Sequence, residues 1–180
     1  MKSGNAVLLA VALCSALLGI VFNAHQRSQQ NTGKLVTNQF LSSTLHDATG
    51  SPQALSRWAG KPLLINFWAP WCAPCVEEMP ELAALQTELG AEHIQFIGIG
   101  LDSQESIRKF ADRFEISYPL YVAGMHGAEL SAQFGNRSGG LPFTALIGQD
   151  GRIVKTWLGR LNMPELRKDL AACLSSASPC

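Results

Sequence analysis

Two cysteines two residues apart, Cys72 and Cys75, carry the clearest chemistry in the sequence, within the segment NFWAPWCAPCVEEMP at residues 66–80. Thiols at this spacing can exchange with a disulfide, because the thiolate of one attacks and the other resolves the mixed disulfide that results. A structural disulfide here would close too short a loop to add much stability. A zinc site would need further cysteines or histidines at ligand spacing, and the histidines are scattered. Redox exchange is therefore favoured, with a copper-binding thiolate pair as the alternative.

The sequence around the pair predicts elements that would activate one of the two thiols. The apolar run KPLLINFWA, residues 61–69, predicts a buried strand, and a helical pattern follows shortly after it. Cys72 should therefore lie at a helix N-terminus, where free N–H groups and the helix dipole favour an anion and lower the pKa of a thiol. These positions predict Cys72 as the nucleophile and Cys75, one turn later, as the resolving thiol. Pro70 and Trp71 are expected to form an apolar lip around an exposed sulfur atom.

The rest of the pattern alternates strands and helices, as expected for an α/β fold. Apolar runs predict further strands at residues 94–101, 118–123, 142–148 and 153–159, with a tight hairpin at Gln149–Gly151. Helical patterns are found at residues 102–114, 127–135 and 162–174. Asp102 is expected to cap the first of these helices and Asn162 the last. This order predicts a mixed central sheet flanked by helices.

The N-terminal segment predicts a membrane anchor. Residues 5–22, NAVLLAVALCSALLGIVF, contain no charge and follow Lys2. As a helix they would span roughly 27 Å, close to the thickness of the hydrocarbon core of a bilayer. We therefore predict a signal anchor or transmembrane helix at residues 1–24, a polar linker at 25–37 and a folded domain at 38–180. A cleaved signal peptide is the alternative, although no convincing small-residue cleavage site follows the apolar run.

Composition restricts the compartment and the partners. With 14 basic and 14 acidic residues the formal net charge is zero, and no basic cluster interleaves with aromatic residues, so nucleic acid is excluded as a partner. An anchored or exported domain would face an oxidising compartment in which disulfides persist. There, Cys173 and Cys180 are the remaining pair once Cys14 of the N-terminal segment is set aside. A structural disulfide between them is one interpretation, and a buried thiol at Cys173 is the other.

The segment FWAPWCAPC, followed by GLPFT at residues 140–144, resembles the thioredoxin superfamily. The N-terminal anchor, CVEEMP and the long stretch at residues 104–134 are similar to its TlpA/ResA branch of membrane-anchored, extracytoplasmic thiol–disulfide oxidoreductases. The resemblance covers about residues 40–174 and implies a thioredoxin-like fold with a central strand–helix insertion. It also implies that Pro142 is a cis proline facing the cysteines, and that the backbone of Leu141 pairs with a substrate peptide.

Three positions depart from the family or refine the resemblance to it. Asn66 stands where thioredoxin has a buried Asp, and an amide cannot shuttle a proton during exchange. Glu78 matches an acidic position that is functional in cytochrome-c-maturation members of the branch, and it lies one turn from Cys75, within reach for proton transfer. The alternative for Glu78 is a solvated helix face shared with Glu77. Phe143 follows the proline where dedicated haem-maturation proteins often have Glu, which argues against a specific role in cytochrome c assembly.

The resemblance implies a reductase of disulfides in exported proteins, among which apocytochrome c is a candidate. Such a reductase needs electrons from across the membrane, so a transmembrane donor of the DsbD/CcdA type is implied as a partner. The enzyme would be a single-pass protein of the bacterial inner membrane with its thioredoxin-like domain in the periplasm, or a secreted periplasmic protein after signal cleavage. No metal or cofactor is expected beyond the redox-active Cys72–Cys75 disulfide. A disulfide oxidase and a copper-binding assembly factor on the same fold are the alternatives.

Overall fold

The computed structural model describes residues 2–175, with side-chain surroundings from residue 17 onward except at 26 and 29. The chain divides into two compact units, Met1–Thr32 and Gly33–Cys180, and the first helix, α1 (Lys2–Leu41), contributes to both. Among the described residues, no helix is both long and apolar enough to cross a bilayer. The predicted anchor at residues 1–24 falls mostly on residues whose side chains lie outside the described set.

The segment expected to be a polar linker, residues 25–37, is helical and belongs to α1. The last turns of this helix carry apolar residues at helical spacing, Val36 and Phe40, and the Phe40 side chain is only 2% exposed. Thr37 is buried as well, and its hydroxyl donates to the main-chain oxygen of Gly33 at 3.1 Å. The folded domain therefore begins earlier than expected, at Gly33. The linker prediction was wrong at this end because the apolar stripe starts only in the last residues of the segment.

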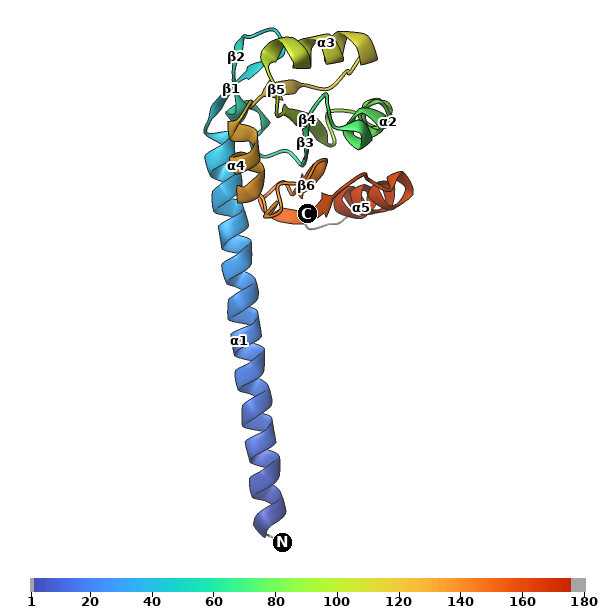
Figure 1. Ribbon diagram of the computed structural model, residues 1–180. Helices are drawn as coiled ribbons and strands as arrows, with labels where there is room; N and C mark the ends of the chain where they lie inside the picture. Colours follow the sequence, from blue (N-terminus) through green and yellow to red (C-terminus); the bar gives the residue numbers. More distant parts are fainter. Residues whose placement is uncertain (1, 176–180) are drawn as a thin grey trace. The chain divides into compact units, whose positions relative to one another are not determined.

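A seven-stranded mixed sheet forms the centre of the second unit, in the order β2–β1–β5–β4–β3–β6–β7 (Figure 1). Strands β5, β4 and β3 run parallel, whereas β1, β2, β6 and β7 pair in antiparallel fashion. All the strands predicted from apolar runs are present. The short pair β1 and β2 was not predicted, because β1 is held by non-local pairing with β5. The bounds are β1 (Thr44–Asp47), β2 (Pro52–Ala54), β3 (Leu63–Trp68), β4 (Gln95–Gly100), β5 (Leu120–Val122), β6 (Phe143–Ile147) and β7 (Ile153–Leu158).

The four α-helices that follow α1 occur where the sequence predicts them, whereas the short 3₁₀ helix η1 was not predicted. The cap of α5 is confirmed, because Asn162 Oδ1 accepts the N–H of Glu165 at 3.1 Å. The cap of α3 is Ser103 rather than Asp102: Ser103 Oγ accepts the N–H of Ser106 at 3.2 Å, while Asp102 Oδ1 accepts the N–H of Ser103. The bounds are η1 (Leu55–Trp58), α2 (Ala73–Leu89), α3 (Gln104–Phe114), α4 (His126–Gln133) and α5 (Met163–Ser175).

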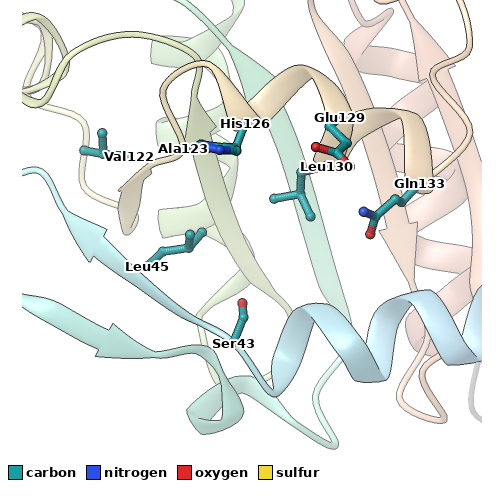
Figure 2. A pocket seen from close by; sticks show the side chains of 8 residues that line it. All are labelled: Ser43, Leu45, Val122, Ala123, His126, Glu129, Leu130 and Gln133. Atoms are coloured by element: carbon teal, nitrogen blue, oxygen red, sulfur yellow. The ribbon is translucent and has the colours of Figure 1, made fainter.

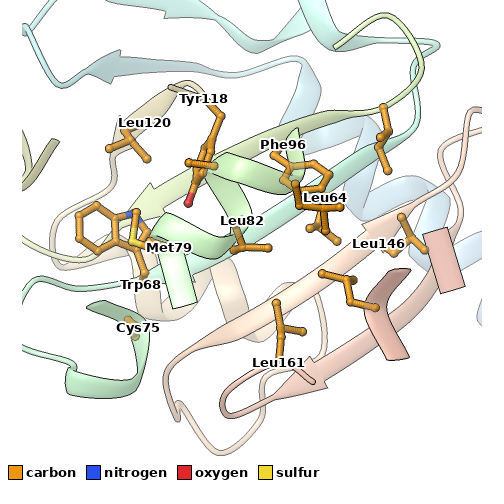
Figure 3. Packing of buried hydrophobic residues seen from close by; sticks show 14 of the residues in the cluster. Leu64, Trp68, Cys75, Met79, Leu82, Phe96, Tyr118, Leu120, Leu146 and Leu161 are labelled. Atoms are coloured by element: carbon orange, nitrogen blue, oxygen red, sulfur yellow. The ribbon is translucent and has the colours of Figure 1, made fainter. Parts of the chain in front are cut away.

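Helices cover both faces of the sheet and divide the core into two clusters (Figure 1). Helices α2, α3 and α5 pack on one face, and the end of α1 packs with α4 on the other. Figure 3 shows the first cluster, in which Cys75 lies with Trp68, Met79 and Leu82. Strand β5 and helix α4 lie between α3 and β6, within the long stretch at residues 104–134 noted in the sequence, and the central insertion itself stays a prediction. The fold is the expected thioredoxin-like α/β fold.

Candidate active site

The cysteine pair lies where β3 ends and α2 begins. Cys72 is the N-cap of α2: its main-chain N–H donates to Ala69 and its carbonyl oxygen accepts from Val76, both at 3.1 Å. Cys75 follows in the first turn, and the two residues form a disulfide with their Cα atoms 5.3 Å apart. The predicted position of Cys72 at a helix N-terminus is therefore confirmed. Reduction would leave its sulfur beside unpaired N–H groups that favour an anion.

The two cysteines are more enclosed than the sequence predicts. Cys75 is fully buried and Cys72 is 6% exposed, because both pack into the core cluster beneath α2. Trp71 is 68% exposed and Pro70 is half-buried. The expectation of an exposed sulfur within an apolar lip is corrected accordingly: only a small part of Cys72 reaches the surface, and Trp71 itself is the exposed apolar residue.

The proline loop lies at the same end of the sheet as the disulfide. The Leu141–Pro142 peptide bond is cis, as the resemblance implies. Strand β6 begins at Phe143, directly opposite Phe67 near the end of β3, so Pro142 lies beside the chain that leads to Cys72. Among the described residues, no hydrogen bond occupies the main-chain N–H or oxygen of Leu141. The pairing of this backbone with a substrate peptide stays a prediction.

Glu78 lies in the core, one turn beyond Cys75. The residue has no exposed surface, so the alternative of a solvated face shared with Glu77 is wrong. Asn66 Nδ2 donates to its Oε1 and the N–H of Leu161 donates to its Oε2, both at 2.9 Å. Burial raises the pKa of Glu78 to about 7, although these two hydrogen bonds and the charge of Arg160 act in the opposite direction. A carboxyl group with this pKa can gain or lose a proton at neutral pH.

A chain of buried polar groups continues from Glu78 across the sheet. Asn66 Nδ2 also donates to Thr144 Oγ1 on β6 at 3.0 Å. Among the described residues, Asn66 Oδ1, Trp68 Nε1 and Tyr118 Oη have no hydrogen-bond partner although they are buried. Burial and the neighbouring Glu78 carboxylate both raise the pKa of Tyr118, so its hydroxyl stays protonated. Figure 3 shows Tyr118 in the same cluster as Trp68.

The partners of Glu78 were not predicted from the sequence. Asn66 was noted only as a replacement for Asp, and Thr144 could have been found because it lies directly opposite Asn66 in the register of β3 and β6. Leu161 contributes a main-chain N–H, for which no side-chain pattern gives a signal. Cys180 falls outside the described residues, so its pairing with Cys173 stays a prediction.

A separate pocket lies on the other side of the sheet. Its volume is about 400 Å³, and none of the predicted site residues lines it. Figure 2 shows its lining at the ends of β1 and β5 and along α4: Ser43, Leu45, Val122, Ala123, His126, Glu129, Leu130 and Gln133. We assign it no part in the thiol chemistry.

Comparison with known proteins shows the family to which the chain belongs. A family model described as Redoxin matches residues 35–172. The chain belongs to the redoxin family. The thiol–disulfide oxidoreductase ResA of Halalkalibacterium halodurans is 30% identical to this redoxin over 153 residues, covering 83% of this chain and 82% of that protein. The thioredoxin-like protein YneN of Bacillus subtilis is 28% identical over 168 residues, covering 90% and 95%.

Solved structures show the same fold. A thiol:disulfide interchange protein of the thioredoxin family from Chlorobium tepidum superposes on this redoxin with a TM-score of 0.65. The superposition covers 74% of this chain and 94% of that chain at 21% identity. Together with the ResA relatives, this confirms the resemblance to the ResA-like branch of the thioredoxin superfamily. This redoxin is therefore a thiol–disulfide oxidoreductase.

Proposed function

We propose that this redoxin reduces disulfides of exported proteins in the periplasm of a bacterium. Residues 1–24 would anchor it in the inner membrane, or would be cleaved as a signal peptide, and the uncharged run at 5–22 supports export in either case. Reduced apocytochrome c is one product of the expected kind. A transmembrane dithiol donor of the DsbD/CcdA type would restore the reduced enzyme after each cycle.

The proposed cycle begins with the reduced enzyme and assigns a role to each cysteine. The thiolate of Cys72 attacks one sulfur of the substrate disulfide, which forms a mixed disulfide and releases the other substrate sulfur as a thiolate. Cys75 loses its proton to the Glu78 carboxylate and attacks Cys72 Sγ. This step releases the second substrate thiolate and closes the Cys72–Cys75 disulfide. Two electrons have then passed from the enzyme to the substrate.

The proposed substrate position follows from the surroundings of Cys72. The free main-chain groups of Leu141 would pair with an extended peptide, in the manner of strand addition. Pro142 would face the disulfide. Because proline has no main-chain N–H, it would place no hydrogen-bond donor there. Trp71 and Pro70 would contact apolar side chains of the substrate, since Trp71 is the large exposed apolar side chain next to Cys72.

The observation that carries the proposed direction is the burial of Glu78 one turn from Cys75. With a pKa raised to about 7, this group carries a negative charge in a large part of the molecules at neutral pH. A negative charge in a region of low dielectric constant disfavours a thiolate nearby. The disulfide is then favoured over the reduced and ionised pair, which lowers the reduction potential.

The reduction potential of the full-length protein tests this proposal. We would equilibrate the detergent-solubilised protein with dithiothreitol and glutathione buffers at pH 7 and quantify the Cys72–Cys75 disulfide by thiol trapping. We expect a value of about −270 mV or lower, as in thioredoxin. A value near about −120 mV, as in a strong oxidant, would instead identify a disulfide donor.

A further inference from the structure

The connection between β7 and α5, residues 159–162, bonds to both halves of the candidate site. The N–H of Gly159 donates to the main-chain oxygen of Pro142 at 2.8 Å. Two residues later, the N–H of Leu161 donates to Glu78 Oε2 at 2.9 Å. The position of this connection therefore decides whether Glu78 keeps one of its two hydrogen-bond donors.

Arg160 fastens this connection to the outer face of α2. Its Nη1 donates to Glu77 at 2.6 Å and its Nη2 donates to Glu81 at 2.9 Å. Glu77 and Glu81 are one turn apart and exposed, whereas Glu78 points into the core. A single exposed ion pair contributes little to stability. The planar guanidinium of Arg160, however, binds two carboxylates through two different nitrogen atoms. This geometry fixes its position, which the single ammonium group of a lysine would not do.

We infer that Arg160 is a positioning residue, which holds the N–H of Leu161 on the carboxylate of Glu78. The inference deepens the proposed function and rests on it, because Glu78 is the acid–base group of that proposal. The other charged and titratable groups that act on Glu78 are Glu81 on the outer side of α2 and Tyr118 in the core. Loss of the Leu161 donor would leave the ionised carboxylate with one hydrogen bond fewer and so raise the Glu78 pKa.

Arg167 provides a matched control. It forms an ion pair with Glu88, also on α2, and its side chain is 47% exposed against 48% for Arg160. In Arg160→Gln we expect the hydrogen exchange rate of the Leu161 amide to rise about tenfold, with a rise of about half a unit in the Glu78 pKa measured by carboxyl 13C NMR. Arg167→Gln should leave both values unchanged. An unchanged Leu161 exchange rate in Arg160→Gln would overturn the inference.

A second variant separates position from charge, because loss of the Arg160 cation alone also raises the Glu78 pKa. The double variant Glu77→Gln/Glu81→Gln keeps the guanidinium and removes its two partners. If charge acts alone, two fewer negative charges lower the Glu78 pKa. If Arg160 acts by position, the released connection raises that pKa and speeds Leu161 exchange. A rise in both values supports the inference, and a fall in the pKa with unchanged exchange overturns it.

These measurements can fail independently of the proposed function. Both follow a hydrogen bond and a titration in the full-length oxidised protein, and neither requires turnover. A reduction potential that refutes the reductase would therefore leave a positive result for Arg160 standing. Conversely, a negative result for Arg160 would leave the measured potential unaffected.

Discussion

Glu77 and Glu78 are adjacent residues of the same type on α2, yet the structure gives them different chemistry. Glu77 is exposed and pairs with Arg160, whereas Glu78 is buried with a pKa raised to about 7. The sequence contains a signal for this difference, because Glu78 lies three residues after Cys75 and four before Leu82, on the buried stripe of the helix. A carboxyl group on such a stripe is either paired or functional, and Glu78 has the hydrogen bonds to remain there.

Replacing Glu78 should change how stability depends on pH. Its pKa in the folded protein is raised to about 7 from 4.5, so between these values the native state holds a proton that the unfolded chain has lost. The contribution of Glu78 to stability is therefore largest below about pH 4.5, falls as the pH rises, and is lower by about 3 kcal/mol above pH 7. In Glu78→Gln this loss should be absent, because the amide does not ionise.

Urea unfolding of the oxidised protein at pH 5 and pH 8 measures this effect. The wild-type free energy of unfolding should fall more between the two pH values than that of Glu78→Gln. Glu129→Gln is the control, since Glu129 is exposed on α4 and should leave the pH dependence as in the wild type. Equal pH dependence in the wild type and Glu78→Gln would contradict the assignment of a raised pKa to this group.

The helices and strands that were predicted correctly are those whose sequence signals lie within their own residues. Strands β3 and β4 are continuous buried runs, and α5 has both its cap and its apolar stripe in the sequence. The missed elements depend on distant partners. β1 alternates half-buried and exposed residues and pairs with β5, and the end of α1 is buried only because the sheet lies against it. In α3 the cap moved by one residue because Ser103, not Asp102, reaches the N–H of Ser106.

The cap of α5 gives a prediction for a single element. Asn162→Ala removes the side-chain oxygen that accepts the N–H of Glu165, so this N–H would lose its partner at the start of the helix. We expect a loss of about 1 kcal/mol in the free energy of unfolding, measured by urea denaturation. Lys168→Ala, an exposed change within the same helix, should stay within about 0.5 kcal/mol of the wild type. Equal effects of the two variants would argue against the cap.

For the second unit as a whole, the position of its beginning can be tested. Phe40 of α1 packs edge-on against Phe134 with ring centroids 5.5 Å apart, and it belongs to the cluster that lies against β3. Phe40→Ala should lower the free energy of unfolding by about 3–5 kcal/mol, as expected for a large buried aromatic side chain. Leu35→Ala on the same helix is the control, because Leu35 is exposed and its removal should have little effect. Similar small effects of both would place the end of α1 outside the cooperative unit.

Only those parts of the candidate site that belong to short sequence motifs could be predicted. The two cysteines, the helix start and the cis proline are carried by short segments, and each is found where expected. The environment of Glu78 is assembled from three distant segments. Asn66 comes from β3, Thr144 from β6, and the N–H of Leu161 from a connection that lies 83 residues after Glu78. A main-chain N–H donor cannot be recognised from the sequence, because almost every residue type has one. Such a contact can be predicted only when the complete fold is known.

The burial of the two cysteines also affects how fast the reduced enzyme is oxidised by small molecules. With Cys75 enclosed and only a small part of Cys72 at the surface, a small oxidant has almost no sulfur to collide with. A protein partner must present its disulfide at this small exposed part of Cys72, beside the exposed Trp71. Oxidation of the reduced thiols by small molecules should therefore be slow, so that, under the proposed function, few electrons are lost before a substrate disulfide is reduced.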